Sequence, residues 1–182
     1  METEEAKLGV YFQILNGIQE QIRFADSKAA FVAAINALLF GFMATNFESL
    51  KIIYRTYGLE SFAFWAPFVV LIVYAVASLL SLIFSILGVY SRFGDLAPQA
   101  RVFFGHIAKA YGRDYEKYIR DTINMTAADW ARELGTQIVE VSQIASVKHK
   151  MVRRAAISVV IAAFLWTLLF VVLLLMTPMP KV

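Results

Sequence analysis

A cluster of charged residues marks the points where two long uncharged runs of the sequence begin. Asp26 and Lys28 come just before the run over 29–47. Four cations come just before the run over 155–180: Lys148, Lys150, Arg153 and Arg154. A carboxylate that faces several cations can form an ion pair for which an incoming anion competes, because both need the same hydrogen-bond donors. The alternative is that the cations only set membrane orientation and extend toward lipid phosphates.

A second candidate site combines aromatic rings with titratable groups. Its members lie within about two helical turns: Phe103, Phe104, His106 and Lys109. Aromatic faces stack on flat rings such as nucleobases, and a cation beside them binds a phosphate. Lys148 or Lys150 would add a cation if this segment folds onto the last helix. The alternative is that the aromatic side chains form the core of a small helical domain.

Patterns typical of enzymes and metal sites are missing from the sequence. The chain has no cysteine, and its two histidines, His106 and His149, lie far apart. It has neither a glycine-rich phosphate loop nor a Gly-x-Ser-x-Gly nucleophile motif. We therefore expect no enzymatic activity, no metal and no cofactor.

The composition predicts that the elements carrying these residues cross a membrane. Of the 182 residues 59% are hydrophobic and 17% are charged, and the mean hydropathy is +0.62. Soluble domains are about 25% charged, so this chain has too few polar residues to coat a soluble globule. A helix needs about 20 apolar residues to cross the bilayer. We expect three such helices, over 29–47, over 61–91 with a start at Pro67, and over 155–178.

The distribution of positive charge predicts the orientation of these spans. Of the 17 Lys and Arg residues, 14 lie in segments 1–28 and 92–154. Because cytoplasmic segments carry the excess of Lys and Arg, we place both segments in the cytoplasm. The 48–60 loop and the carboxyl terminus are then external. A formal net charge of +3 does not by itself indicate a nucleic-acid partner.

Two of the spans are expected to continue into the cytoplasm as helical stalks. Apolar residues recur three and four positions apart, as a heptad seam requires: Leu8, Tyr11, Leu15, Ile18, Ile22, Ala25 and Ala29. This heptad seam packs either on the neighbouring cytoplasmic helix or on another subunit. No helix-breaking sequence interrupts 4–45, which predicts one helix. Thr126 and Asp129 are typical of a capping box, and the helical period continues from there to Pro178.

The sequence thus predicts an all-α membrane protein with a small helical cytoplasmic head. The head and the third stalk share segment 92–154, in which short helices are expected within 99–111 and at 115–123. Two stripes within the spans have a role either in packing within the monomer or in lining a pore after oligomerisation. The first stripe has small residues, Ala30, Ala34 and Gly41, and the second is polar: Tyr74, Ser78, Ser81, Ser85 and Gly88.

Three short stretches of this sequence resemble the transmembrane subgroup of the Pycsar effector family. They are Phe-Ala-Asp-Ser-Lys-Ala-Ala over 24–30, Phe-Phe-Gly-His-Ile-Ala over 103–108, and Gln-Ile-Val-Glu-Val-Ser-Gln-Ile-Ala-Ser-Val-Lys-His-Lys over 137–150. They occur in the order of the family and at its distances from the membrane boundaries. The resemblance covers the chain from about Gly17 to the start of the third span.

The resemblance implies a role in bacterial anti-phage defence. Members of the family respond to cyclic CMP (cCMP) or cyclic UMP (cUMP), made by a cognate pyrimidine cyclase upon infection. They then impair the inner membrane, and the infected cell dies before phage matures. We expect a homo-oligomer in the lipid bilayer, linked to the cyclase in function without required direct contact. The chain lacks a recognisable cyclic-nucleotide-binding β-roll, so the ligand site stays open. The alternative function is a constitutive membrane scaffold that recruits a cytosolic partner.

Overall fold

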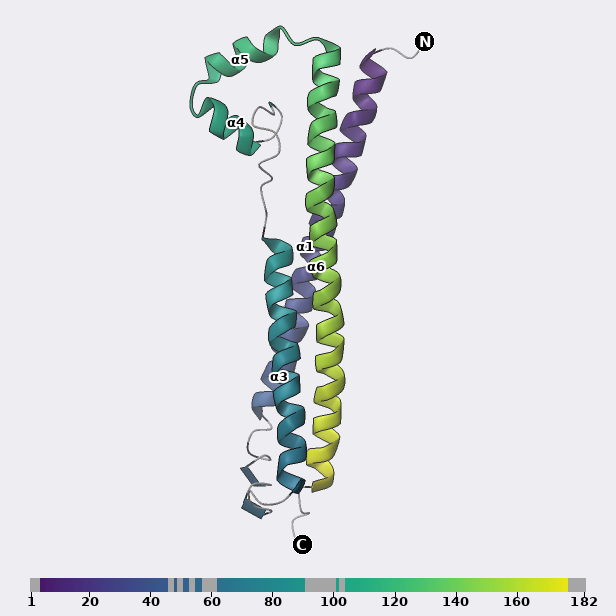
Figure 1. The fold of residues 1–182 in the computed structure, drawn as a ribbon, viewed down its shortest axis with the longest axis vertical. Coiled ribbons are helices and arrows are strands. Elements are labelled where there is room, and N and C mark those ends of the chain that lie inside the picture. The colour runs from purple at the N-terminus through teal and green to yellow at the C-terminus, as the bar shows by residue number, and fades with distance from the viewer. Residues whose placement is uncertain are drawn as a thin grey trace. The chain divides into compact units, whose positions relative to one another are not determined.

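The protein is almost entirely helical in the parts that its computed structural model describes. These parts are residues 4–45, 62–90 and 104–176, together with the single or paired residues 48, 51–52, 55–56 and 101. The helices, labelled as in Figure 1, are α1 (Glu4–Thr45), α3 (Phe62–Val89), α4 (Phe104–Tyr111), α5 (Tyr115–Ile123) and α6 (Ala127–Met176). The described residues contain no strand, which confirms the predicted all-α class.

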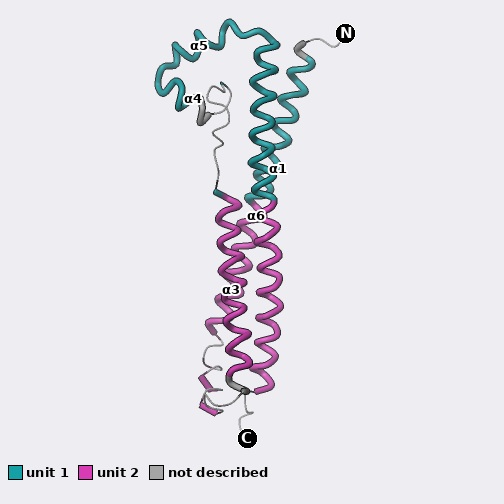
Figure 2. Tube along the Cα trace, in the orientation of Figure 1, with its two compact units in different colours: residues 1–26, 90–149 teal, residues 27–89, 150–182 magenta. Residues whose placement is uncertain are grey.

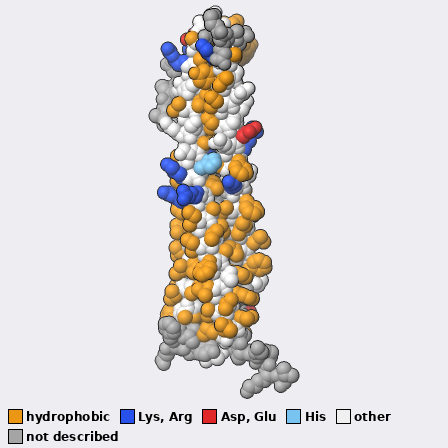
Figure 3. All heavy atoms as spheres, turned by 90° about the vertical axis from the view of Figure 1, so that its right-hand side faces the viewer, with side chains coloured by type: hydrophobic (Ala, Val, Ile, Leu, Met, Phe, Trp, Pro, Cys, Tyr) orange, Lys and Arg blue, Asp and Glu red, His pale blue; other side chains and the backbone are white. Residues whose placement is uncertain are grey.

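Three of these helices are long and apolar enough to cross a membrane. The candidate spans are Ala6–Thr45, Trp65–Val89 and Ala127–Met176. Side chains that face outward from these helices between residues 27 and 89 and beyond 150 are largely apolar, as the face in Figure 3 shows. Phe31, for example, is 67% exposed and Phe164 is 69% exposed. Large apolar side chains in such exposed positions fit contact with lipid rather than with water.

The start of the second span differs from the sequence expectation. The helix begins at Phe62, and Pro67 lies inside it. A proline within a helix removes one intrahelical hydrogen bond, but the first four N–H groups of a helix have no intrahelical partner in any case. Pro67 is the sixth residue of α3, beyond these first four, so one intrahelical hydrogen bond is lost there. Pro67 is also fully buried, so its ring contributes to packing instead of ending the helix.

The beginning of α6 has the capping box that the sequence predicts. The backbone N–H of Asp129 donates to the Thr126 hydroxyl at 3.2 Å, and the backbone N–H of Thr126 donates to Asp129 Oδ2 at 3.0 Å. These reciprocal bonds satisfy donors that a helix end otherwise leaves without partners. The hydrogen bond from the Thr126 hydroxyl, followed by that from its backbone N–H, lowers the pKa of the Asp129 carboxyl.

The chain forms two compact units, coloured separately in Figure 2. Unit 1 comprises residues 1–26 and 90–149, and unit 2 comprises residues 27–89 and 150–182. Two of the three boundaries, at 26/27 and 149/150, fall inside helices, because α1 and α6 each contribute residues to both units. Each unit therefore contains one part of α1 and one part of α6.

The core of unit 1 is made by the heptad seam of α1. Leu15 is buried together with Leu134 and Val141 of α6. Partly buried side chains that pack against them come from both helices: Leu8, Tyr11, Ile18, Ile22 and Ile138. The heptad seam was expected to pack either on the neighbouring cytoplasmic helix or on another subunit. In the structure it packs on α6 of the same chain.

The core of unit 2 brings together α1, α3 and α6. One cluster of buried residues is Met43, Tyr74, Ala77, Ala162, Leu169 and Leu173. Polar contacts join the same helices: the Asn36 amide donates to the Ser78 carbonyl at 2.9 Å, and the Ser78 hydroxyl donates to Asn36 Oδ1 at 2.6 Å. Such bonds between helices in an apolar environment fix which faces meet.

Candidate functional site

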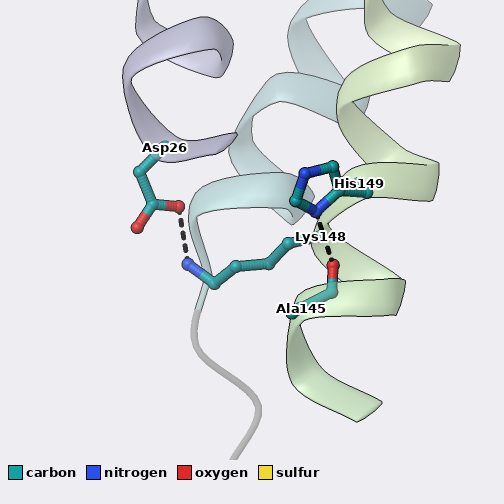
Figure 4. Close-up of polar contacts among 4 residues, drawn as sticks. All are labelled: Asp26, Ala145, Lys148 and His149. Carbon is teal, nitrogen blue, oxygen red and sulfur yellow. Dashed lines mark hydrogen bonds and ion pairs between the residues drawn. The ribbon is translucent and has the colours of Figure 1, made fainter. Parts of the chain in front are cut away.

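An ion pair joins α1 to α6 within unit 1. Lys148 Nζ lies 2.6 Å from Asp26 Oδ1 (Figure 4). The Lys148 side chain is 4% exposed, whereas the Asp26 side chain is 36% exposed. Lys148 is seven residues from Val141 and seven from Ala155, both buried, so it lies on the same inward face of α6. Its ammonium group is thus held in a mostly apolar seam.

The two partners of this ion pair have different electrostatic situations. An ammonium group removed from water is costly unless a counter-charge and hydrogen bonds compensate it. Asp26 supplies the negative charge for Lys148, while its own second oxygen can still reach water because the side chain is half-exposed. An anion that took the place of Asp26 would meet a donor already positioned by the helix seam.

The remaining cations of the predicted boundary cluster are arranged differently. Lys28, Arg153 and Arg154 belong to unit 2 and are exposed. The Arg154 guanidinium carbon lies 5.9 Å from the centre of the Phe84 ring, a cation–π distance. Four cations of α6 were considered as partners of Asp26. In the described structure Lys148 forms the ion pair with this carboxylate.

The residues next to Lys148 are exposed. Lys150 belongs to unit 2 and is exposed on α6. His149 places its Nδ1 atom 2.9 Å from the carbonyl oxygen of Ala145 in the preceding turn (Figure 4). Because a carbonyl oxygen only accepts hydrogen bonds, Nδ1 carries the proton in this contact.

The predicted aromatic site lies largely outside the described residues. Phe103 and the side chains of Phe104 and His106 are not among them. Lys109 is exposed in the last turn of α4. The structure describes a different aromatic pair in the head, Tyr111 and Tyr118, whose rings meet edge to face at 5.2 Å. The sequence analysis missed this pair because the turn at Gly112, with φ of +56°, is what folds α5 back toward α4.

The two stripes of the spans lie in opposite environments. Tyr74, Ser78, Ser81 and Ser85 are all buried inside unit 2, and a Cβ added at Gly88 would lie 3.3 Å from Val152 Cγ2. This polar stripe packs within the chain. The small stripe does not: Ala30, Ala34 and Gly41 are exposed, and a Cβ added at Gly41 would meet nothing within 4 Å. Of the two roles considered for the small stripe, packing within the monomer is therefore not the one seen in the described structure.

Sequence analysis also missed two buried polar side chains on α6. Gln137 is 3% exposed and Glu140 is 8% exposed. The Oε1 atom of each has no hydrogen-bond partner in the described part of the chain. The available signal was their position among buried Leu134 and Val141, where a polar residue is unexpected in a heptad helix.

Comparison with known families accounts for nearly the whole chain. A family model described as the Pycsar effector protein domain matches residues 10–176. The chain belongs to the Pycsar effector family. Family membership assigns this effector to anti-phage defence, and the three apolar helices make it a multi-pass membrane protein. Neither a curated protein nor a solved structure shows significant similarity to the chain.

Proposed function

We propose that this Pycsar effector is activated by a cyclic pyrimidine mononucleotide, cCMP or cUMP, and then impairs the bacterial inner membrane. The infected cell dies before phage matures, which is abortive infection. Family membership supports the defence role, and three helices that fit a membrane support the target. Unit 1 supplies polar and charged groups, such as Lys148 and Glu140, for a polar ligand.

The observation that carries this proposal is that both units share two helices. The boundaries at 26/27 and 149/150 lie inside α1 and α6. A ligand that alters how α1 packs on α6 in unit 1 therefore acts on helices that also form the core of unit 2. The Asp26–Lys148 ion pair lies at this boundary. Rigid helices with two alternative packings are a common basis for such coupling.

The proposal includes the setting in which the protein acts. Residues 1–28 and 92–154 are cytoplasmic and the carboxyl terminus is external, because 14 of the 17 Lys and Arg residues lie in those two segments. The effector acts as a homo-oligomer, since Ala30, Ala34 and Gly41 are exposed and would let a second helix approach closely. It is not an enzyme and needs no cofactor, and the cyclase acts through its product.

Co-expression with a pyrimidine cyclase tests the proposal. Bacteria carrying the effector and an active cyclase should lose membrane potential and stop growing. Cells with a catalytically inactive cyclase, or with a cyclase that makes a cyclic purine nucleotide, should grow normally. Equal growth under all three conditions would contradict the proposal and would favour a scaffold. Equal toxicity in all three would show that the effector ignores the nucleotide.

A further inference from the structure

Two buried side chains of α6 lack the hydrogen bonds that their burial requires. Gln137 is 3% exposed and Glu140 is 8% exposed, and neither Oε1 atom has a partner in the described part of the chain. Burial of a polar atom without a partner costs free energy, and the cost is larger for a carboxylate. Buried polar groups in native proteins are nearly all hydrogen-bonded, so each exception needs an explanation. A ligand that carries an N–H donor would supply one.

The helix that carries these residues contacts the head of unit 1 at a neighbouring position, Glu133. Glu133, Gln137 and Glu140 are four and three residues apart, which places them on one side of the helix. Glu133 Oε2 accepts a hydrogen bond from the backbone N–H of Arg101 at 3.0 Å. Tyr118 of α5 donates to the carbonyl of the same Arg101 at 3.2 Å. A ligand bound by Gln137 and Glu140 would therefore lie on α6 about one to two turns from this contact with the head.

The donors and acceptors of the two side chains fit the edge of a pyrimidine base. An ionised carboxylate only accepts hydrogen bonds, while an amide both donates and accepts. Cytosine presents an amino group beside a ring nitrogen that accepts, and glutamate is a known partner for that amino group. Uracil presents a carbonyl oxygen in place of the amino group, and this oxygen would face the carboxylate with nothing to donate.

We propose that Gln137 and Glu140 bind the base edge of the cyclic nucleotide and that they favour cytosine over uracil. The two N–H bonds of the exocyclic amino group donate to the unpartnered Oε1 atoms, one to Glu140 and one to Gln137. This inference rests on the proposed function, since it names the group that reads the activating nucleotide. It places the base on α6, apart from the aromatic segment around Phe104.

Binding of both nucleotides to the full-length chain in lipid nanodiscs tests the inference. Calorimetry should give a dissociation constant for cCMP about tenfold or more below that for cUMP, a difference of about 1.4 kcal/mol or more. In Glu140→Gln the new amide can also donate to a uracil carbonyl oxygen. The ratio of the dissociation constant for cUMP to that for cCMP should therefore fall to about one or below. Glu116→Gln is the matched control, because Glu116 is 67% exposed on α5, and it should keep the wild-type ratio.

Each other outcome counts against the inference in a distinguishable way. Equal wild-type affinities, or an unchanged ratio in Glu140→Gln, would overturn it while leaving the proposed function in place. A changed oligomer size with an unchanged ratio would assign Glu140 to contact with a second copy and would also overturn it. No binding of either nucleotide to the wild type would overturn the proposed function itself.

A measurement on the wild-type chain covers the case in which Glu140→Gln does not fold. Hydrogen–deuterium exchange with and without cCMP reports which amides the ligand protects. Slower exchange over 133–141 supports the inference. Protection confined to other parts of the chain would contradict it.

Discussion

At the scale of single residues, the Asp26–Lys148 ion pair is unequal in burial. Lys148 is 4% exposed and Asp26 is 36% exposed. Loss of the carboxylate removes the negative charge that lies 2.6 Å from a buried ammonium group. Loss of the ammonium group leaves a carboxylate that water can reach. The two single substitutions should therefore differ in their effect on stability.

We predict that Asp26→Ala lowers the free energy of unfolding by about 1–3 kcal/mol. Lys148→Met, which keeps an apolar side chain of similar length in the seam, should lower it by less than about 1 kcal/mol. The double variant should resemble Lys148→Met, because the buried ammonium group is absent from both. Unfolding in mixed micelles of SDS and a mild detergent measures all three. A larger loss for Lys148→Met than for Asp26→Ala would contradict the prediction.

Some of these residue contacts could be predicted from the sequence. The charged boundary cluster was visible, and the heptad spacing from Val141 to Lys148 to Ala155 would have selected Lys148 as its inward member. The burial of Gln137 and Glu140 was not predicted, although both lie among the buried Leu134 and Val141 of the same helix. The missing partners of their Oε1 atoms could not be predicted, because hydrogen bonding between distant segments has no periodic signal in the sequence.

At the scale of helices, the continuous stretches were the best predicted feature. Apolar residues recur with the helical period, without interruption, along both long helices. This pattern predicted the extents that α1 and α6 have in the structure. The error at Pro67 came from treating a proline as the first helical residue, when the preceding apolar residues also join the helix. The capping box at Thr126 and Asp129 was correct because it depends on neighbours in the sequence only.

The capping box predicts a low pKa for the Asp129 carboxyl. The Thr126 hydroxyl and backbone N–H bind the charged form, which lowers the pKa. Since the folded-state pKa is lowered, the contribution of the cap to stability is present above the ordinary aspartate pKa. It is lost as the pH falls through the lowered value. In an NMR titration Asp129 should titrate below an ordinary aspartate, and Thr126→Ala should move its pKa upward. An unchanged pKa in Thr126→Ala would contradict this.

The glycines of the spans offer a matched pair of substitutions. A Cβ at Gly88 would lie 3.3 Å from Val152 Cγ2, whereas one at Gly41 would meet nothing within 4 Å. Gly88→Leu should therefore lower the unfolding free energy by about 1–3 kcal/mol through overpacking, and Gly41→Leu should not. If the small stripe is a subunit contact, Gly41→Leu should instead reduce oligomer size. Equal unfolding free energies for the two variants, together with the wild-type oligomer size in both, would contradict the prediction.

At the scale of the whole molecule, the class and the family can be predicted from the sequence, but a ligand site cannot. Class follows from summed apolar content, and family follows from short motifs such as that at 24–30, so neither needs tertiary information. The ligand site proposed above depends on contacts between distant segments, which the sequence pattern does not reveal. The β-roll that would have marked a nucleotide site is not recognisable in this sequence.

The distribution of Lys and Arg predicts the topology of the whole chain. A carboxyl-terminal alkaline phosphatase fusion should be active, because that enzyme folds only outside the cytoplasm, and the same fusion at the amino terminus should be inactive. The physical reason is the excess of 14 of 17 cations in segments 1–28 and 92–154. An inactive carboxyl-terminal fusion that is expressed at full length would reverse the assignment.

Dye release from sealed liposomes tests the central claim most directly. The purified effector is reconstituted into liposomes of bacterial inner-membrane lipids that contain a self-quenched dye. We predict release upon addition of cCMP or cUMP, and no release with 5′-CMP, which lacks the cyclic phosphate, or from liposomes without protein. Liposomes that stay sealed with both cyclic nucleotides, or that leak equally without them, would contradict the account.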